Sequence, residues 1–184
     1  MSAVYTLSGR FVLFAPRKRR EARHYDECRG AAVSAETAGR KSGREVSCCF
    51  TGHRVIPSSE RDRLRARILE SIMRLTADGV FCFCCGGALG FDTLAAQCVL
   101  EARRTDSRIR LLLFLPYPAQ SERWSISDRH VYEEILRAAD AVSYASEAYT
   151  EQCMLTRNRQ LVDASCVCIA YLTHPHGGTF YTVT

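Results

Sequence analysis

A glycine-rich turn followed by an aspartate is the part of the sequence that points most directly to chemistry. Residues 85–93 read Cys-Gly-Gly-Ala-Leu-Gly-Phe-Asp-Thr, between an apolar strand-like run and a segment with helical spacing. Glycines at Gly86, Gly87 and Gly90 let the main chain approach a ligand closely, and the following helix start offers unpaired N–H groups to an anion. The turn is therefore a candidate phosphate site, or else a turn that only lets a strand pack tightly on a helix.

Asp92 stands where that helix begins, and two interpretations of it remain open. Capping of the helix explains an aspartate there without any ligand. A carboxylate beside a phosphate would be repelled. A functional Asp92 would therefore cap the helix and also accept a hydrogen bond from a sugar hydroxyl, or act as a catalytic acid/base.

Two familiar nucleotide-binding motifs are excluded by spacing. The sequence has no Gly-Lys-Ser/Thr step, so it does not encode a P-loop NTPase. Its G-G-x-x-G-F-D spacing differs from G-x-G-x-x-G, and the turn follows the second strand of the domain instead of the first. A standard NAD fingerprint is therefore not expected.

Two other predicted strand ends carry flexible or polar residues. Gly52 and Arg54 close the first strand of the domain, where Arg54 could pair with a phosphate, although a plain surface turn would look the same. Gly178 and Thr179 follow the last strand and offer amides and a hydroxyl. Together with the first turn, they predict a nucleotide-sized site at one edge of a sheet.

One predicted helix adds two further candidates. Arg157 could clamp a phosphate and Asn158 could hydrogen-bond a base or a ribose, although a solvated helix face explains both residues. His174 and His176 have no evident third ligand, so no metal and no cofactor are predicted.

These residues are held by alternating strands and helices. A helix opens at 57–59 with Ser59 as its cap, carries one apolar stripe, and ends at Gly79. The alternation predicts an α/β, Rossmann-like, doubly wound fold with a mainly parallel sheet and helices on both faces. The expected strands cover 46–51, 80–85, 109–115, 141–143 and 166–172, and the other helices 93–103, 128–139 and 151–164.

Length and charge divide the 184 residues into two parts. The chain has 47% apolar and 24% charged residues, as globular proteins do. Residues 1–44 hold a net charge of +6, with a basic cluster at 17–20, whereas residues 45–184 hold −1. We expect residues 1–44 to be a basic, disordered segment in which only Phe11–Ala15 could pair as an edge strand, and residues 45–184 to form one domain.

The ten cysteines indicate a reducing compartment. Several of them, such as Cys84, Cys85 and Cys168, lie inside apolar runs, where a free thiol behaves as a small hydrophobic group. No signal peptide and no bilayer-length apolar run is recognisable. The expected location is therefore the cytoplasm, without a membrane partner.

Taken in order, the motifs resemble the SLOG superfamily, and most closely its YpsA-like branch. The resemblance covers residues 46–184 and adds Pro116, Gln120, Trp124 and Asp163 to the motifs above. It implies a Rossmann-like fold with a site for nucleotides or nucleotide-derived ligands at the two glycine turns. The implied binding residues are Gly52, Arg54, Gly86, Gly87, Gly90, Asp92, Arg157, Asn158, Gly178 and Thr179.

Two departures from the superfamily bear on activity. LOG-type enzymes, which release a base from a nucleoside monophosphate, carry a P-G-G-x-G-T-x-x-E loop, but His176 precedes Gly177-Gly178 and Thr182 stands at the glutamate position. The chain also stops at Thr184, before a further strand and helix common in the family. We therefore expect a domain truncated at its carboxyl end, in which the LOG reaction does not transfer directly.

Three functions follow as expectations. The first is binding of a nucleotide or nucleotide-derived ligand by a sensor or regulator, which could be a homo-oligomer. The second is hydrolysis of the N-glycosidic bond of a nucleoside monophosphate, with Asp92 as the catalytic residue. The third is single-stranded DNA binding, which the charge of −1 over residues 45–184 disfavours.

Overall fold

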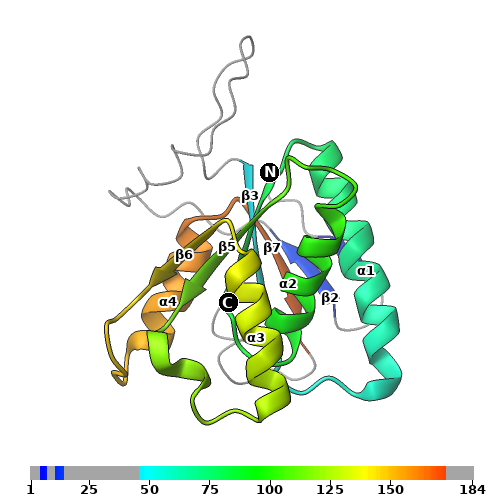
Figure 1. Ribbon diagram of the computed structural model, residues 1–184. Helices are drawn as coiled ribbons and strands as arrows, with labels where there is room; N and C mark the ends of the chain where they lie inside the picture. The colour runs from blue at the N-terminus through cyan, green and yellow to red at the C-terminus, as the bar shows by residue number, and fades with distance from the viewer. Residues whose placement is uncertain (1–4, 8–10, 15–45, 173–184) are drawn as a thin grey trace.

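A parallel sheet interleaved with helices forms the body of the molecule (Figure 1). The computed structural model describes residues 5–7, 11–14 and 46–172. The elements in chain order are β1 (Tyr5–Leu7), β2 (Phe11–Phe14), β3 (Ser47–Gly52), α1 (Ser58–Ala77), β4 (Cys82–Cys85), α2 (Phe91–Ala102), β5 (Arg110–Leu115), the 3-10 helix η3 (Pro118–Ser121), α3 (Ile126–Ala138), β6 (Ala141–Tyr144), α4 (Cys153–Asp163) and β7 (Val167–Tyr171).

The strands lie side by side in the order β1-β2-β7-β3-β4-β5-β6. The five strands from β7 to β6 are all parallel, and they alternate along the chain with four helices, as the sequence predicted. Strand β2 pairs antiparallel with β7 over Phe11–Phe14, and β1 pairs antiparallel with β2. The expected pairing of this segment is therefore seen, although β1 and not β2 forms the sheet edge.

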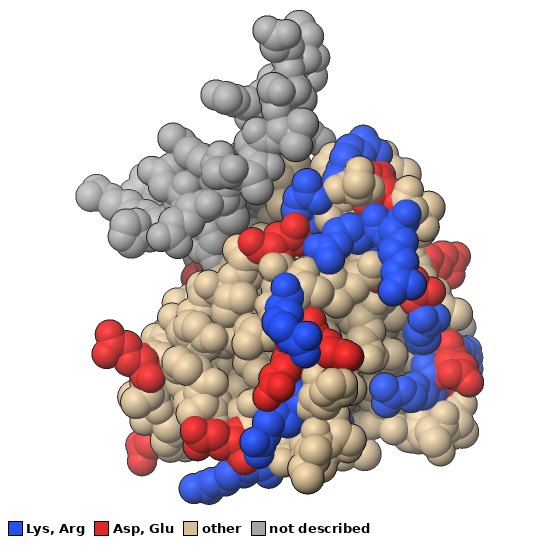
Figure 2. Space-filling view, in the orientation of Figure 1, with Lys and Arg blue, Asp and Glu red and all other residues tan. Residues whose placement is uncertain are grey.

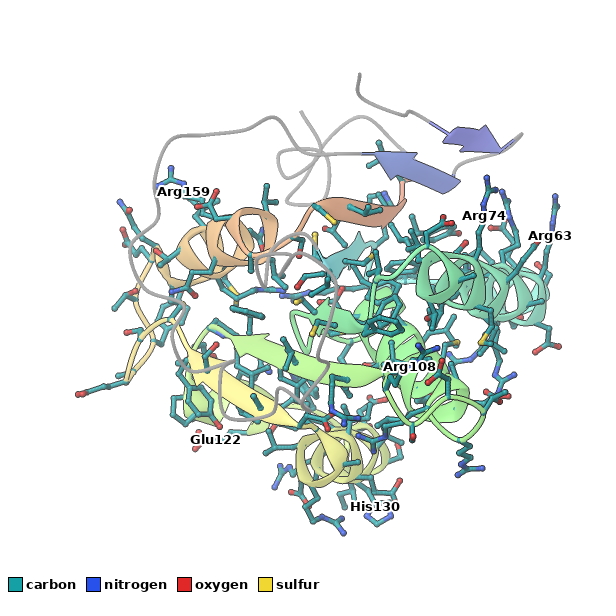
Figure 3. The ribbon with its side chains drawn as sticks, turned by 90° about the horizontal axis from the view of Figure 1, so that it is seen from above. Arg63, Arg74, Arg108, Glu122, His130 and Arg159 are labelled. Carbon is teal, nitrogen blue, oxygen red and sulfur yellow. The ribbon has the colours of Figure 1, made fainter. Side chains whose placement is uncertain are left out.

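Helices cover both faces of the sheet, as Figure 3 shows from above. On one face, α1, α2 and α3 bury Phe50, Phe83 and Leu111 in the main core. On the other face, α4 places Leu161 over a smaller core of Cys49, Cys84, Cys168, Leu112 and Phe114. The cysteines of these strands thus act as apolar filler.

None of the nine cysteines in the described part of the chain forms a disulfide. Burial raises the pKa of the Cys48 and Cys85 thiols well above the ordinary value of 9.0, so both stay protonated. Protonated, buried thiols are poor nucleophiles and metal ligands. These cysteines stabilise the core and contribute no reactive group.

Helix α1 shows which local predictions succeeded. Its stripe of Leu64, Ile68, Ile72 and Leu75 is buried as predicted, and Gly79 follows the helix with a φ of 91°. The predicted cap at Ser59 is wrong. The cap lies two residues earlier, at Pro57, and makes no side-chain hydrogen bond. Pro57 supplies a φ of −55° and a carbonyl that accepts from Glu60 N.

Candidate functional site

The order of the strands fixes where a ligand site is expected. The chain runs from β3 outward through β4, β5 and β6, and then returns to place β7 on the other side of β3. In open α/β sheets, ligands bind at the carboxyl ends of the strands where the order reverses. That switch point lies between β3 and β7, whose ends Gly52 and Tyr171 are paired in register.

A buried ion pair lies beside this point and joins two distant parts of the sequence. Arg157 on α4 donates from Nη1 to Oδ2 of Asp92 on α2, at 3.3 Å. Only 10% of the Arg157 side chain and 5% of the Asp92 side chain are exposed. The same Asp92 oxygen accepts from the backbone N of Ala88, also at 3.3 Å, and so fixes the glycine turn to α4 through a single carboxylate.

Asp92 does not cap its helix, although both interpretations of this residue included capping. The cap position is Gly90, and Asp92 lies in the first turn with its carboxylate directed back to the residues before the helix. Burial raises the pKa of Asp92 above its ordinary value of 3.8. Arg157, the Ala88 N–H and, more weakly, Arg54 lower that pKa but do not offset burial.

The pair retains hydrogen-bonding atoms that the described residues do not use. Asp92 Oδ1 accepts nothing from them, because both hydrogen bonds to this carboxylate end on Oδ2. Arg157 Nε is buried without a partner in the described part of the chain, and Nη2 donates to none of it. A buried, unpaired N–H costs about 1–3 kcal/mol, so one acceptor and two donors here favour a polar guest.

The glycines of the turn allow neighbouring side chains and main chain to pack closely against it, and do not leave an open space over its N–H groups. A side chain at Gly86 would collide with the Arg157 guanidinium and approach Asp92 Oδ2 to 2.7 Å. At Gly87 (φ 65°) it would meet Leu115 and come within 3.1 Å of Gln120 Nε2, and at Gly90 (φ 80°) it would meet the Arg54 carbonyl. The first turn is thus closely packed against the ion pair, and its main chain is less open than the sequence suggested.

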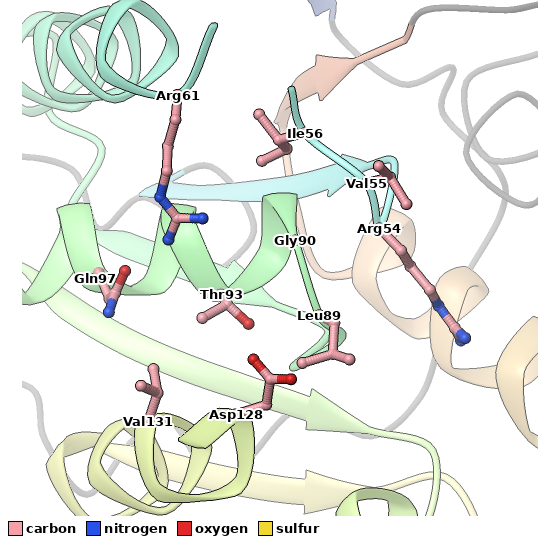
Figure 4. Close-up of a pocket in the computed structure, with 10 residues that line it drawn as sticks. All are labelled: Arg54, Val55, Ile56, Arg61, Leu89, Gly90, Thr93, Gln97, Asp128 and Val131. Atoms are coloured by element: carbon pink, nitrogen blue, oxygen red, sulfur yellow. The ribbon is translucent and has the colours of Figure 1, made fainter. Parts of the chain in front are cut away.

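The other predicted residues are distributed around this pair. Gly52 packs against the Phe91 ring, and Asn158 lies half-buried next to Arg157 on α4. Arg54 is exposed, and Figure 4 shows its guanidinium directed away from α2. Gly178 and Thr179 lie outside the described residues, so their place at the site stays a prediction.

Gln120 is a turn-supporting residue that the site prediction missed. It is buried on η3 and donates from Nε2 to the Gly87 carbonyl (3.2 Å) and to the Tyr132 hydroxyl (3.0 Å). The glycine turn is thereby fixed to α3 as well as to α4. A short 3-10 helix after Pro116 has no periodic signal, so only the motif order pointed to Gln120.

A hollow of about 350 Å³ opens on the other side of the α2 start (Figure 4). It lies among α1, α2 and α3 and includes Gly90 and Arg54 of the predicted site. Its other lining residues, which the prediction missed, are Val55, Ile56, Arg61, Leu89, Thr93, Gln97, Asp128 and Val131. Helical spacing alone sets Arg61 apart from the apolar stripe of α1, as it does for a solvated residue, so only the packing of three helices reveals this hollow.

Comparison with known proteins places the chain in a family. The YpsA family model, described as the YspA SLOG family, matches residues 58–182. A UPF0398 protein of Halalkalibacterium halodurans is 33% identical over 98 residues, which cover 52% of each chain. The chain thus spans about half the length of this curated relative.

Two further relatives extend the match. The uncharacterized SPbeta prophage-derived protein YoqJ of Bacillus subtilis is 27% identical over 131 residues, or 65% of this chain and 75% of YoqJ. A UPF0398 protein of Bacillus pumilus is 26% identical over 122 residues, or 63% of each chain.

Within the described residues, every helix is too short or too polar to cross a membrane. With a family match over more than half of its length and the Rossmann-like sheet that the motifs implied, the chain belongs to the YpsA SLOG family.

Proposed function

We propose that this protein binds a nucleotide or a nucleotide-derived ligand at the carboxyl edge of its sheet and works as a sensor or regulator. The observation that carries the proposal is the buried Asp92–Arg157 pair, with its unused donors and acceptor beside the switch point. Membership of the SLOG family supports a small-molecule ligand. The free thiols of the described part support a reducing, cytoplasmic location.

The chemistry of the pair favours a sugar over a phosphate at this point. A carboxylate and a guanidinium together carry no net charge, and Asp92 repels an anion placed against it. A hydroxyl can donate to Asp92 Oδ1 and accept from an Arg157 N–H, so a ribose diol uses the atoms that the protein leaves unpaired. The phosphate then lies farther out, toward the exposed Arg54. Gly178 and Thr179 lie outside the described residues and stay predicted phosphate-binding residues.

Calorimetric titration of nucleoside monophosphates and ADP-ribose into the purified chain tests this proposal. We expect saturable binding, and a loss of at least about tenfold in affinity for Asp92→Asn and for Arg157→Lys, because each removes one charge-assisted hydrogen bond. Asp62→Asn, on the exposed start of α1, is the matched control and should bind normally. If folded wild-type protein binds none of these ligands, the proposal is wrong.

Hydrolysis of an N-glycosidic bond is a second candidate, favoured by one observation. Burial raises the pKa of Asp92, as a general acid that protonates a leaving base requires. Release of free base from nucleoside monophosphates would then be abolished by Asp92→Asn. Base release that survives this substitution would remove Asp92 from the catalytic role.

Single-stranded DNA binding has no comparable support. Figure 2 shows basic and acidic side chains interleaved on one face of the described residues, without a continuous basic stripe. Such a mixture offers little to a phosphate backbone. The small-molecule proposal is therefore the one the site favours.

A further inference from the structure

We infer that the hollow among α1, α2 and α3 receives the base of the proposed ligand, and that Arg61 and Asp128 select guanine over adenine. The inference rests on the proposed function and adds the identity of the base. Its basis is the set of polar side chains that line the hollow.

Two polar side chains reach this space without a partner of their own. Arg61, in the first turns of α1, makes no hydrogen bond or ion pair with any described residue, and Figure 4 shows its guanidinium directed toward Thr93 and Gln97. The half-buried Gln97 amide likewise makes no hydrogen bond within the described chain. Donors that converge on a hollow of this size favour a small ligand.

Asp128 supplies the opposite charge from the facing helix. The Ser125 hydroxyl donates to Asp128 Oδ2 at 2.7 Å and accepts from Asp128 N at 3.1 Å, which holds the carboxylate at the start of α3. Oδ1 accepts nothing from the described residues, and in Figure 4 the carboxylate points toward Thr93. The hollow therefore has a cationic wall on α1 and an anionic wall on α3.

Guanine matches this polarity and adenine opposes it. Guanine carries acceptors at O6 and N7, which pair with arginine, and donors at N1 and N2, which pair with a carboxylate. Adenine presents its N6 amino donor where guanine has O6, and an acceptor at N1 where guanine has a donor. In the same orientation, adenine would place its N6 donor against the Arg61 donors and its N1 acceptor against the Asp128 carboxylate. The aliphatic side chains of Ile56, Leu89 and Val131 would contact either base without distinguishing them.

The hollow and the ion pair meet at the start of α2. Gly90 and Thr93 line the hollow, while Asp92 between them faces Arg157. Thr93 Oγ1 donates to the Ala88 carbonyl at 2.9 Å, and Asp92 accepts from the N–H of that same residue. A ligand with its base in the hollow would thus lie against the same turn that the ion pair fixes from its other side.

Comparison of GMP, IMP and AMP by isothermal titration tests the inference. We expect GMP to bind at least about tenfold more tightly than AMP, as one well-placed bidentate contact provides, with IMP between them because it lacks the N2 amino group. Asp128→Asn should reduce GMP affinity and raise AMP affinity, because an amide can donate to adenine N1 where the carboxylate repels it, so the preference for GMP should be lost. Arg61→Met should weaken GMP binding in the same way.

Matched controls are available next to Arg61 on α1. Asp62→Asn and Arg63→Met change exposed residues that do not line the hollow, and Arg63 points away from the molecule in Figure 3, so neither should alter the preference. Circular dichroism confirms that each variant is folded. Equal affinity for GMP and AMP, or a preference that survives Asp128→Asn, overturns the guanine inference and leaves the proposed function standing. Absence of any nucleotide binding overturns both.

Discussion

The two sides of the α2 start use charge in opposite ways. On the α4 side, Asp92 is 5% exposed and meets a guanidinium inside the protein. On the α1 and α3 side, Arg61 and Asp128 are exposed and face an open hollow. A buried pair contributes to the fold whether or not a ligand is present, whereas exposed charges with spare atoms contribute little until something binds.

This contrast separates stability from selectivity. Substitutions on the buried side should lower the free energy of unfolding first and affect ligand binding as well. Substitutions around the hollow should change ligand preference and leave the free energy of unfolding almost unchanged. Measuring the free energy of unfolding of variants on either side therefore tests this contrast.

The largest expected effect is that of Arg157→Met. It leaves the Asp92 carboxylate buried without its cation, and breaking a buried pair in this way costs about 3–5 kcal/mol. Urea unfolding followed by circular dichroism should show the loss. The exposed Arg63→Met serves as control, and Asp92→Asn combined with Arg157→Met should recover part of the loss. A cost for Arg157→Met below about 1 kcal/mol would show that the pair is not buried in solution.

Gly90→Ala should have the next largest effect. A left-handed backbone costs an L-residue about 1–2 kcal/mol, and at Gly90 the new methyl group would also collide with the Arg54 carbonyl, which is backbone and cannot swing aside. We expect a total loss of about 3 kcal/mol in the free energy of unfolding measured with urea. Gly79→Ala has a similar φ of 91° at the end of α1 and should cost only about 1 kcal/mol. Equal losses for the two variants would contradict a packing role for Gly90.

The fold was predictable because each of its signals is local. Apolar runs of strand length, one stripe on α1 and glycine at helix ends give the order of elements without tertiary information. The errors lie at the ends of helices, where the first helical residue depends on a single capping hydrogen bond. Helix α3 begins at Ile126 and not at Asp128, because Ser125 accepts from Asp128 N and caps it.

The site was predictable only as a set of separate residues. Asp92 and Arg157 were both named, but 65 positions separate them, and no local pattern states that one holds the other. The turn glycines suggested an open anion cradle, whereas the structure fills the space over Gly86 with the Arg157 guanidinium. Arg61 could not be predicted as a site residue, because helical spacing cannot show that α3 places Asp128 across the hollow from α1.

The dependence of stability on pH provides a smaller and more specific effect. Because the pKa of folded Asp92 is raised above 3.8, its contribution to stability is fully present at lower pH and is lost as pH rises through the folded pKa. The stability of wild type relative to Asp92→Asn should therefore fall as pH increases above about 4, and other groups cancel in the difference. Urea unfolding at a series of pH values measures it. A difference that grows with pH would mean that Arg157 outweighs burial.

The smallest effect on stability should come from the hollow itself. Arg61→Met removes an exposed charge that makes no hydrogen bond or ion pair within the described residues, so it should change the free energy of unfolding by less than about 0.5 kcal/mol. Asp128→Asn also removes a negative charge from the first turn of α3, so its cost should stay below about 1 kcal/mol. The same two variants carry the expected loss of guanine preference. A destabilisation comparable to that of Arg157→Met would show that these charges are part of the packing, and the contrast between the two sides of α2 would then be wrong.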